Sequence, residues 1–356
     1  MNMVREKKSA LYKLIMLIAV QLIFFIAITW FFDPFYQYHE PYAGLKAVLN
    51  DHDNQMPGSI STLPYDSVLV GSSVAENFDS SVLDRNYHCN TLKIIKGSGS
   101  VADLLYYLER AHGAQELKNV FWCLDLFALE ASNEVSLYGK EIPRYLHTES
   151  VLDDVTYLLN KDVIFNKIPL MVASSLQEYN TGGNAYNWSK GKVFSAQVAM
   201  QAYQKPKEPL KAQDFTNLKS VIDKNVQMVV EEVSAHPEIQ YRFLMPPYSM
   251  MWWDCAYVNG VLEKNFYILE KVIPALLECS NVELYYYQDE AQIICNLDNY
   301  MDLIHYTPAV NQYMLDQLIA GEGRVTKENW QMVVSGMREL ADRISREEIY
   351  RYYERP

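Results

Sequence analysis

The sequence has little cysteine. Its 356 residues include five scattered ones: Cys89, Cys123, Cys255, Cys279 and Cys295. The number is odd and no pair has the spacing of metal ligands, so the sequence predicts neither a zinc site nor a disulfide framework. Cys123 lies in an apolar run and is expected to be a buried thiol. No cofactor is expected either.

The chain is also short of basic residues. It has 31 Lys and Arg against 44 Asp and Glu, which gives a net charge of -13. A nucleic-acid-binding protein normally carries a basic face, so this class of protein is excluded. A hydrophobic content of 49% is enough for a substantial core, and the length suits one large domain or two small ones. No internal repeat is visible.

Long apolar runs are equally scarce, with one exception. Residues 14–32 are apolar except for Gln21 and Thr29, and at about 1.5 Å per residue this run spans a bilayer core of roughly 30 Å. No second run of that length follows. The next basic residue after the run is Lys46, whereas several precede it: Arg5, Lys7, Lys8 and Lys13. The positive-inside rule therefore predicts a cytoplasmic tail, 1–13, and places the rest of the chain outside.

A cleavable signal peptide is the competing interpretation of this run. A small-x-small cleavage site would have to follow it, but the residues there are bulky, and the run is long for a signal peptide. The aromatic residues at its outer end suit a membrane interface: Trp30, Phe31, Phe32, Phe35 and Tyr36. The sequence thus predicts a signal anchor in a cell membrane, crossing it once.

After a connector, 33–63, the chain alternates between strand and helix patterns. A short helix is expected at Tyr42–Leu49 in the connector. The expected strands are Ser67–Val70, Thr91–Ile95, Asn119–Leu124, Tyr241–Met245 and Val282–Tyr286. The expected helices between them are Val101–His112, Asn217–Ser234 and Leu262–Leu277. This alternation predicts an α/β fold with a parallel sheet of about five strands, covered by helices on both faces.

The main domain is expected to cover residues 64–325, with an insertion at 149–215 and a C-terminal helix in 326–356 that has Thr326 as its N-cap. Long insertions in compact domains are usually functional or disordered. The aromatic and amide residues of this one favour a lid or a substrate platform that contacts a sugar: Tyr186, Asn187 and Trp188. The alternative is that Trp188 anchors the insertion to the core.

The stretch after the first expected strand carries the strongest chemical signal. Gly71-Ser72-Ser73 follows the apolar run Val68–Val70, and Ala75 comes shortly after. Small residues let the backbone turn sharply after a buried strand, which exposes a serine hydroxyl and frees backbone N–H groups to face an oxyanion. The alternative is a turn whose small residues serve packing alone.

A serine needs a base to become a nucleophile, and the base needs an orienting group. His305 is the best candidate base, and Asp302 stands three residues before it. Asp302 can accept the imidazole Nδ1 proton and leave Nε2 free to take the Ser73 proton. Thr307 and Pro308 then suit the N-cap and first position of a helix. The alternative is that Asp302 and His305 only cap that helix.

The order of these residues resembles the SGNH (GDSL-like) hydrolase superfamily. There, a serine block after the first strand pairs with a C-terminal Asp-x-x-His block, as Gly71-Ser72-Ser73 and Asp302–His305 do here. In an α/β-hydrolase the acid and the histidine lie on different loops. The resemblance covers about Asp66 to Ile319 and implies a flavodoxin-like three-layer α/β/α fold.

The resemblance also implies roles for single residues. Ser73 is then the nucleophile and its N–H an oxyanion donor, with a second donor from Gly97 or Gly99, of which Gly99 is favoured. The third block of the family, Gly-x-Asn-Asp, is not recognisable: the matching strand ends at Asp125, and Asn133 comes some way on. Ser73, Gly97, Asp125, Pro246 and the Asp302–His305 loop are expected to meet at the carboxyl ends of the strands.

With its anchor, the chain looks like bacterial envelope proteins of this superfamily, such as the teichoic-acid D-alanyl transfer protein and the partners of polysaccharide O-acetyltransferases. The resemblance implies an extracytoplasmic serine esterase or O-acyltransferase that acts on a cell-envelope glycopolymer, often beside a multi-pass membrane acyltransferase. Two alternatives stay open: a non-catalytic binding or assembly factor with the same fold, and a phosphoester-cleaving enzyme. The lack of metal-ligand clusters disfavours the second.

Overall fold

The structure is a computed structural model of the chain, and it describes residues 2–136, 143–148, 150–206 and 208–354. The chain divides into two compact units. The first consists of Met1–Leu63 and Tyr138–Gly182, and the second of Pro64–Leu137 and Gly183–Pro356. The predicted insertion, 149–215, is therefore shared between the two units, and its first residue, Glu149, lies outside the described part of the chain.

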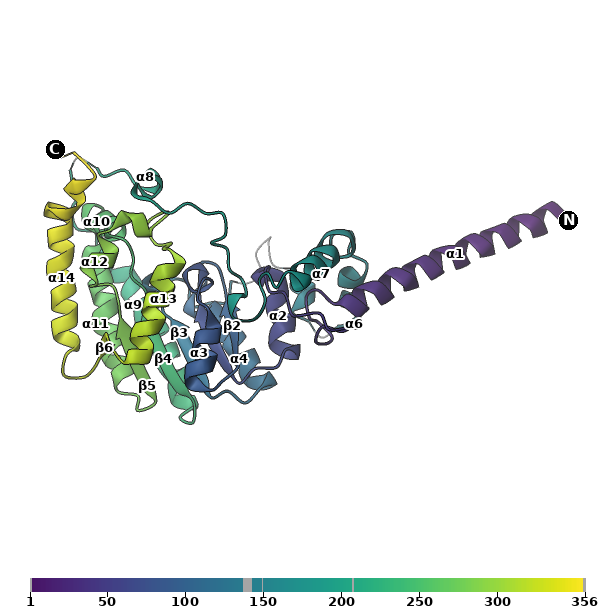
Figure 1. Cartoon of the computed structure of the whole chain (residues 1–356), viewed down its shortest axis with the longest axis horizontal. Helices are drawn as coiled ribbons and strands as arrows, with labels where there is room; N and C mark the ends of the chain where they lie inside the picture. The colour runs from purple at the N-terminus through teal and green to yellow at the C-terminus, as the bar shows by residue number, and fades with distance from the viewer. Residues whose placement is uncertain (1, 137–142, 149, 207, 355–356) are drawn as a thin grey trace. The chain divides into compact units, whose positions relative to one another are not determined.

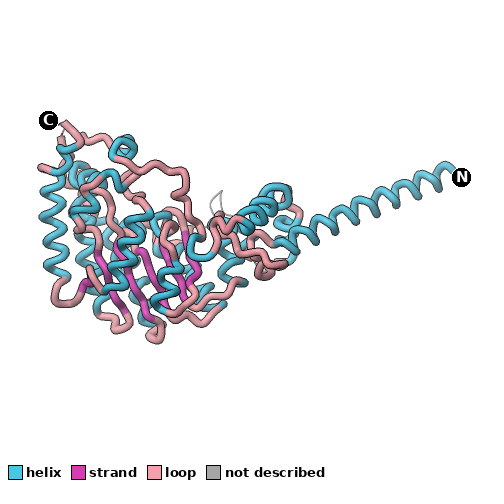
Figure 2. The backbone as a smooth tube through the Cα atoms, viewed as in Figure 1, coloured by secondary structure: helices cyan, strands magenta, loops and turns pink. Residues whose placement is uncertain are grey.

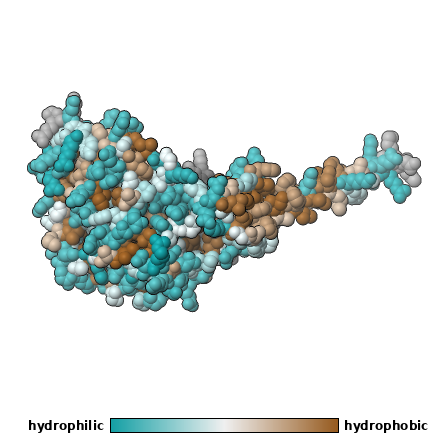
Figure 3. Space-filling model, viewed as in Figure 1, coloured by the Kyte–Doolittle hydropathy of each residue, from teal (hydrophilic) through white to brown (hydrophobic). Residues whose placement is uncertain are grey.

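The first unit begins with the long helix α1, Asn2–Phe32. Its part Arg5–Phe32 is long and apolar enough to cross a membrane, and the predicted run 14–32 lies within it. Figure 1 shows α1 in purple at the N-terminus, and Figure 3 shows the apolar surface along it. The helix ends at Phe32, because the next residue, Asp33, has a left-handed φ of 39°. The Asp33 carboxylate then accepts hydrogen bonds from the backbone N–H groups of the next turn.

The helix predicted at Tyr42–Leu49 is wrong. Ala43 and Gly44 have φ values of 57° and 74°, which interrupt a right-handed helix, and Val48 pairs with Thr181 in an isolated bridge. The helix of this region is α2, His52–Thr62, which begins after the N-cap Asp51. Tight packing explains Gly58 within α2, because a Cβ there would lie 2.2 Å from the carbonyl oxygen of Phe35.

The remaining elements of the first unit follow Arg144. They are η2 (Arg144–Leu146), α6 (Val151–Leu158), the π-helical turn η3 (Val163–Lys167) and α7 (Ile168–Leu176). A small apolar core joins them to the segment after α1: Phe35, Leu146, Tyr157 and Val163. The Tyr157 hydroxyl donates to the Asp33 carboxylate at 2.7 Å, so the same tyrosine serves the core and the end of α1.

The second unit is built on a six-stranded sheet, drawn in magenta in Figure 2. Its strands are β1 (Ser67–Gly71), β2 (Thr91–Ile95), β3 (Asn119–Cys123), β4 (Gln240–Met245), β5 (Val282–Tyr286) and β6 (Arg324–Val325). The order is β2-β1-β3-β4-β5-β6. The five predicted strands are confirmed and pair in parallel, whereas β6 is antiparallel to β5. A two-residue strand leaves no pattern that a sequence reading could detect.

Helices cover the sheet, and both β1 and its edge neighbour β2 are buried at every position. Figure 1 shows α3 (Ser80–Tyr87) and α13 (Pro308–Ala320) in front of the strands, and these two helices contact each other. A second set of helices contact one another in turn: α4 (Val101–Ala114), α9 (Thr216–Ala235), α11 (Leu262–Leu277) and α14 (Trp330–Arg346). The fold is thus mixed α/β with a mostly parallel sheet, as predicted.

Shorter helices complete the second unit: η1 (Ser73–Ala75), α5 (Leu126–Glu130), η4 (Gly182–Asn184), α8 (Ala196–Ala199), η5 (Met200–Ala202), α10 (Met250–Val258), α12 (Ala291–Ile294), η6 (Leu297–Asn299) and η7 (Glu348–Arg351). The prediction of one C-terminal helix from Thr326 is corrected. The helix α14 begins after the N-cap Asn329, because Thr326 directly follows β6 and its N–H bonds to the Asn329 side chain. The helix then ends before η7.

Candidate active site

The turn after β1 depends on small side chains. A Cβ on Gly71 would lie 2.7 Å from the Ala75 Cβ and 3.1 Å from the Cys123 Cβ, so only glycine fits between the turn and β3. Ser72 is the N-cap of η1, and its Oγ accepts from the Val74 N–H at 3.5 Å. The backbone therefore reverses within a few residues and presents Ser73, half-buried, at the carboxyl end of β1.

The structure brings Ser73, His305 and Asp302 together. Ser73 Oγ lies 2.8 Å from His305 Nε2, which confirms the expected contact between the hydroxyl and the imidazole. His305 Nδ1 lies 2.6 Å from Asp302 Oδ2. Since the carboxylate accepts the Nδ1 proton, Nε2 is left as the acceptor that faces the serine hydroxyl. The three side chains form the hydrogen-bonded chain that nucleophile, base and orienting acid require.

Asp302 also fixes the loop that carries His305. Its Oδ1 accepts from the backbone N–H groups of Ile304 and His305, at 2.9 and 2.8 Å. The N-cap of α13 is Thr307, with Pro308 at its first position, so Asp302 is not the cap of that helix. Burial raises the pKa of Asp302, but the hydrogen bonds from the His305 side chain and backbone outweigh it, and the net pKa is lowered. The carboxylate is therefore ionised at neutral pH.

Trp188 lies directly against these residues. Its indole Nε1–H donates to the Ser73 carbonyl oxygen at 2.9 Å. Its ring meets the His305 ring edge to face, with centroids 5.3 Å apart and an interplanar angle of 89°. Its backbone N–H donates to Asn77 Oδ1 at 3.2 Å. Trp188 thus supports both the nucleophile turn and the imidazole, in addition to any contact with a substrate.

The two neighbours of Trp188 have other surroundings. Tyr186 is buried, with a left-handed φ of 58°. Asn187 is half-buried, and its side-chain oxygen accepts from the backbone N–H and the hydroxyl of Ser189, so it shapes the turn that carries Trp188. Of the three residues predicted to contact a substrate, Trp188 is the one that lines the pocket described next.

A pocket of about 250 Å³ opens over the nucleophile. Its lining combines the three hydrogen-bonded residues with three others: Ser73, Asp302, His305, Trp188, Lys192 and Met301. Sequence reasoning missed Lys192 and Met301. Met301 stands next to the Asp-x-x-His motif and Lys192 four residues after Trp188, but neither spacing indicates a shared pocket. The exposed ammonium of Lys192 brings a positive charge to a chain whose net charge is -13.

The predicted oxyanion donors differ in their geometry. The Gly99 N–H donates to the Lys96 carbonyl at 2.9 Å and closes a turn in which Ser98 has a φ of 51°. Gly99 was the favoured second donor, but its N–H is already used in this turn. Gly97 follows Lys96 after β2 on the same edge of the sheet, and the Lys96 N–H donates to the Gly71 carbonyl oxygen at 3.1 Å. The remaining candidate donors are therefore the N–H groups of Ser73 and Gly97.

Asn133 does not replace the missing family asparagine. Its side-chain amide donates to the carbonyl oxygen of Val221 on α9, at 3.0 Å. The residue at the end of β3 is instead Asp125, which is buried directly behind the nucleophile turn. Tyr248 Oη donates to Asp125 Oδ1 at 2.5 Å. Burial raises the pKa of Asp125 to about 6, while hydrogen bonds from Tyr248 and Ser72 act in the opposite direction.

Two further side chains hold the nucleophile turn in place. The Asn311 amide on α13 and the Tyr306 hydroxyl both donate to the Val74 carbonyl oxygen, at 3.1 and 3.4 Å. Both side chains are buried. Sequence reasoning missed them, and only a polar residue at a core position of α13 could have signalled Asn311. These bonds hold the segment that follows His305 against the Ser73 turn, in addition to the direct contact between Ser73 and His305.

Metal-type donors gather elsewhere in the second unit. Among the described residues, His112, Glu232 and His236 bring donor atoms within 4.8 Å of one another. They lie near the amino ends of β3 and β4, away from the carboxyl ends that carry Ser73. His112 Nε2 is 2.7 Å from Glu232 Oε1, and Tyr241 donates to the same oxygen. His112, Glu232 and Tyr241 thus form a hydrogen-bonded network, and the His236 ring stacks on His112 with centroids 3.9 Å apart.

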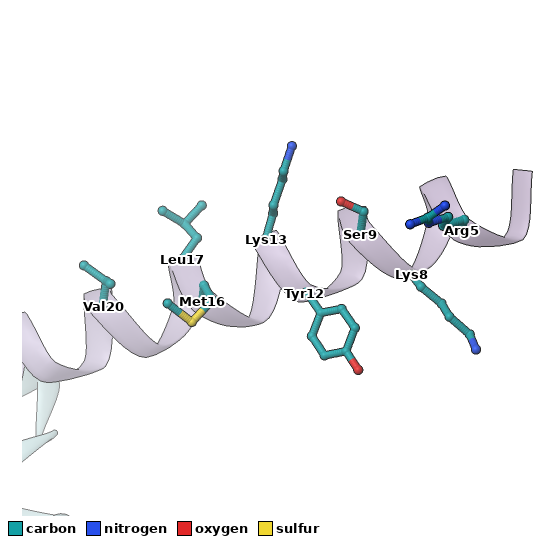
Figure 4. Close-up of a pocket in the computed structure, with 8 residues that line it drawn as sticks. All are labelled: Arg5, Lys8, Ser9, Tyr12, Lys13, Met16, Leu17 and Val20. Atoms are coloured by element: carbon teal, nitrogen blue, oxygen red, sulfur yellow. The ribbon is translucent and has the colours of Figure 1, made fainter. Parts of the chain in front are cut away.

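A shallow hollow of about 660 Å³ lies along α1 and is drawn in Figure 4. All of its lining comes from this single helix: Arg5, Lys8, Ser9, Tyr12, Lys13, Met16, Leu17 and Val20. Figure 4 shows these side chains pointing away from the helix in different directions. Such a surface cannot orient a reacting group, so the smaller pocket over Ser73 is the candidate active site.

Comparison with known proteins gives no family for the chain. No protein-family model matches it, and no curated protein does.

Proposed function

We propose that the chain is a membrane-anchored serine esterase or O-acyltransferase that modifies a cell-envelope polysaccharide or a teichoic-acid-like polymer. The observation that carries this proposal is the continuous hydrogen-bonded chain from Ser73 through His305 to Asp302. An isolated serine or histidine on a protein surface has many uses, but this order of donor and acceptor atoms is the one that acyl transfer needs.

The proposed reaction has two halves. Ser73 Oγ attacks the ester carbonyl carbon of the acyl donor while its proton passes to His305 Nε2. The tetrahedral oxyanion is stabilised by the N–H groups of Ser73 and Gly97. When this intermediate collapses, the imidazolium gives the proton to the departing alcohol, and the acyl group stays on Ser73. Water or a sugar hydroxyl then loses its proton to His305 and attacks the carbonyl carbon of the acyl-Ser73 ester. When this second intermediate collapses, the bond from the acyl carbon to Ser73 Oγ breaks, the imidazolium returns its proton to Ser73 Oγ, and the free acid or the acylated sugar leaves.

The fold and the anchor support the same assignment. The parallel strands run in the order 2-1-3-4-5, which is the flavodoxin-like order in which ligands bind at the carboxyl ends of the strands. We assign the second unit to the SGNH type of this fold, with the serine after the first strand and the Asp-x-x-His motif after the last parallel one. The basic residues before the apolar run orient α1 with its N-terminus in the cytoplasm, which leaves Ser73 outside.

One observation favours a second candidate function. Asn133 is bonded to Val221, so it cannot complete a three-donor oxyanion hole. Losing one such donor typically costs ~10²- to 10³-fold in rate. A protein with this fold but without catalytic activity would act as a binding or assembly factor for the same polymer, beside a multi-pass acyltransferase that carries out the transfer. Reactivity of Ser73 separates the two candidates.

The test is covalent labelling of the purified full-length chain, in detergent, by a fluorophosphonate. The proposal expects stoichiometric labelling that Ser73→Ala abolishes and His305→Ala strongly slows, because the alkoxide forms only with the base in place. Ser61→Ala is the matched control, since Ser61 is an exposed serine of the first unit. Labelling that survives Ser73→Ala contradicts the proposed nucleophile. A folded wild-type chain that takes no label favours the binding factor.

A further inference from the structure

The first unit exposes a stripe of large apolar side chains on α6, η3 and α7. The exposed fractions are high: Leu152 83%, Val155 48%, Phe165 65%, Leu170 47% and Leu176 77%. Pro169 and Ala173 of α7 are exposed as well, on the same face as Phe165 and Leu176 at helical spacing. Large exposed apolar patches on a protein surface mark a contact with another apolar body.

The amphipathic pattern of α7 is unusual for a helix in water. Its buried residues include two serines, Ser174 and Ser175, whereas its exposed face carries leucine and proline. Ser175 is used inside the unit, where its Oγ accepts from the Lys46 N–H at 2.6 Å. A surface helix of a soluble domain turns its apolar stripe inward and its polar residues outward. Here the exposed face is at least as apolar as the buried one.

The stripe is continuous with the membrane-crossing helix. The Phe165 ring meets the Phe25 ring of α1 edge to face, with centroids 6.2 Å apart, and both α6 and η3 contact α1. Phe25 stands seven residues before Phe32, the end of α1, which corresponds to about 10 Å along the helix axis. Phe165 is therefore held at the depth of the outer part of α1.

We infer that α6, η3 and α7 form a lipid-contacting element that rests in the headgroup and acyl boundary of the leaflet where α1 ends. The inference depends on the proposed membrane anchoring by α1. Interfacial helices bury an apolar face ~5–10 Å into this boundary, which agrees with the position of Phe165 beside Phe25. Lys161 and Asp162, the two helical residues directly before η3, are exposed and suit the polar headgroups rather than the bilayer centre. Lipid is favoured over a partner protein because the stripe continues the lipid-facing surface of α1.

The consequence is that α1 does not act as a simple tether. A single helix leaves the attached domain free to rotate about it, whereas a second lipid contact fixes the first unit against the bilayer. Such a contact would present the first unit in one orientation to substrates that are themselves attached to the membrane.

The test uses the wild-type full-length chain in vesicles of phosphatidylcholine and phosphatidylglycerol, doped with a phospholipid that carries a photoactivatable diazirine on its acyl chain. Carbene insertion is mapped by mass spectrometry of peptides. The inference expects insertion into 14–32 and into 163–176, and background insertion into 216–235, the α9 peptide. Insertion into α1 alone overturns the inference and leaves the anchor intact. No insertion into α1 shows instead that the proposed anchoring fails, and the inference with it.

A pair of variants sharpens the result. Leu170→Lys puts a charge on the stripe without touching the buried face, and it should lower insertion into 163–176 several-fold while insertion into 14–32 stays the same. Leu210→Lys is the matched control, because Leu210 is an exposed leucine of the second unit. Unchanged insertion into 163–176 in Leu170→Lys, in a chain that unfolds at the wild-type temperature, contradicts the stripe as the lipid-contacting face.

Discussion

At the scale of single residues, the Ser73–His305–Asp302 chain makes a quantitative prediction. If these residues act as one unit, Ser73→Ala and His305→Ala should each lower ester hydrolysis by ~10⁴- to 10⁶-fold, and the double variant should lose no more than the single ones. Asp302→Asn should also lose activity, since an amide no longer accepts the Nδ1 proton. Hydrolysis of an activated acetyl ester measures all four. Losses that multiply in the double variant would show that the residues act independently.

Trp188 is both a support of the site and part of its surface, and one pair of variants separates these roles. Trp188→Phe removes the Nε1–H bond to Ser73 and keeps an aromatic ring beside His305, whereas Trp188→Ala removes both. If the ring contacts a sugar acceptor, Trp188→Ala should weaken use of the acceptor more than it slows labelling by a small fluorophosphonate, because the support of the Ser73 turn is lost in both variants whereas the ring is lost only in Trp188→Ala. If acceptor use and labelling fall equally in Trp188→Phe and in Trp188→Ala, and both variants unfold at a lower temperature, Trp188 is a structural anchor instead.

Asp125 predicts a pH dependence of stability. Its folded-state pKa of about 6 lies above the usual 3.8, so the folded chain holds a proton there more tightly than the unfolded chain. The contribution of Asp125 to the free energy of unfolding is therefore full below pH 3.8 and falls as pH rises through 6, by ~3 kcal/mol. Asp125→Asn should remove this fall.

The measurement is urea unfolding of the two chains between pH 4 and 7, and the difference between them isolates Asp125. Asp289, whose pKa burial also raises to about 6, titrates in the same range and remains in both chains. Parallel stability curves for the wild type and Asp125→Asn would contradict the buried, proton-binding state of this carboxyl.

At the scale of elements, the turn after β1 depends on the fit of Gly71. A methyl group there would overlap Ala75 and Cys123, so Gly71→Ala should displace η1, lower stability and abolish labelling of Ser73. Gly113→Ala is the matched control, because a Cβ at Gly113 meets nothing within 4 Å inside α4. Alanine in an open helical position should add ~0.5–1 kcal/mol of stability. Equal effects of the two changes would refute the close packing.

The sequence predicted those elements best whose pattern is local. The bounds of β5 and α11 agree with the predictions at both ends, because continuous apolar runs and helical spacing are visible without the rest of the fold. The helix at Tyr42–Leu49 failed, since the left-handed Ala43 and the pairing of Val48 with Thr181 depend on distant parts of the chain. The strand β6 was too short to be detected.

The residues of the candidate site also differ in whether a local pattern in the sequence identifies them. Ser73, His305 and Asp302 each stand in a recognisable local motif, so they could be named from the sequence. Asp125 could be placed at the same edge because it follows a predicted strand. Asn311 and Lys192 stand in no motif, and only the fold brings them to the nucleophile turn or its pocket. The preference for Gly99 over Gly97 failed at one hydrogen bond: the turn from Lys96 to Gly99 uses the Gly99 N–H internally, which no spacing could show.

At the scale of the whole molecule, the asymmetry of charge about α1 predicts the topology. Basic residues precede the apolar run and none follows it before Lys46, so the N-terminus should lie in the cytoplasm and the second unit outside. In intact cells, a membrane-impermeant maleimide should label Lys224→Cys, an exposed position on α9, above the background of the native cysteines. It should label Ser9→Cys only after the membrane is permeabilised.

The reverse pattern contradicts the topology, and a mature N-terminus beyond Phe32 would show that the helix is a cleaved signal. The position of Ser73 relative to the membrane follows from this one helix. A reversed topology would therefore exclude an envelope polymer as the substrate, and a cleaved helix would exclude a lasting membrane anchor.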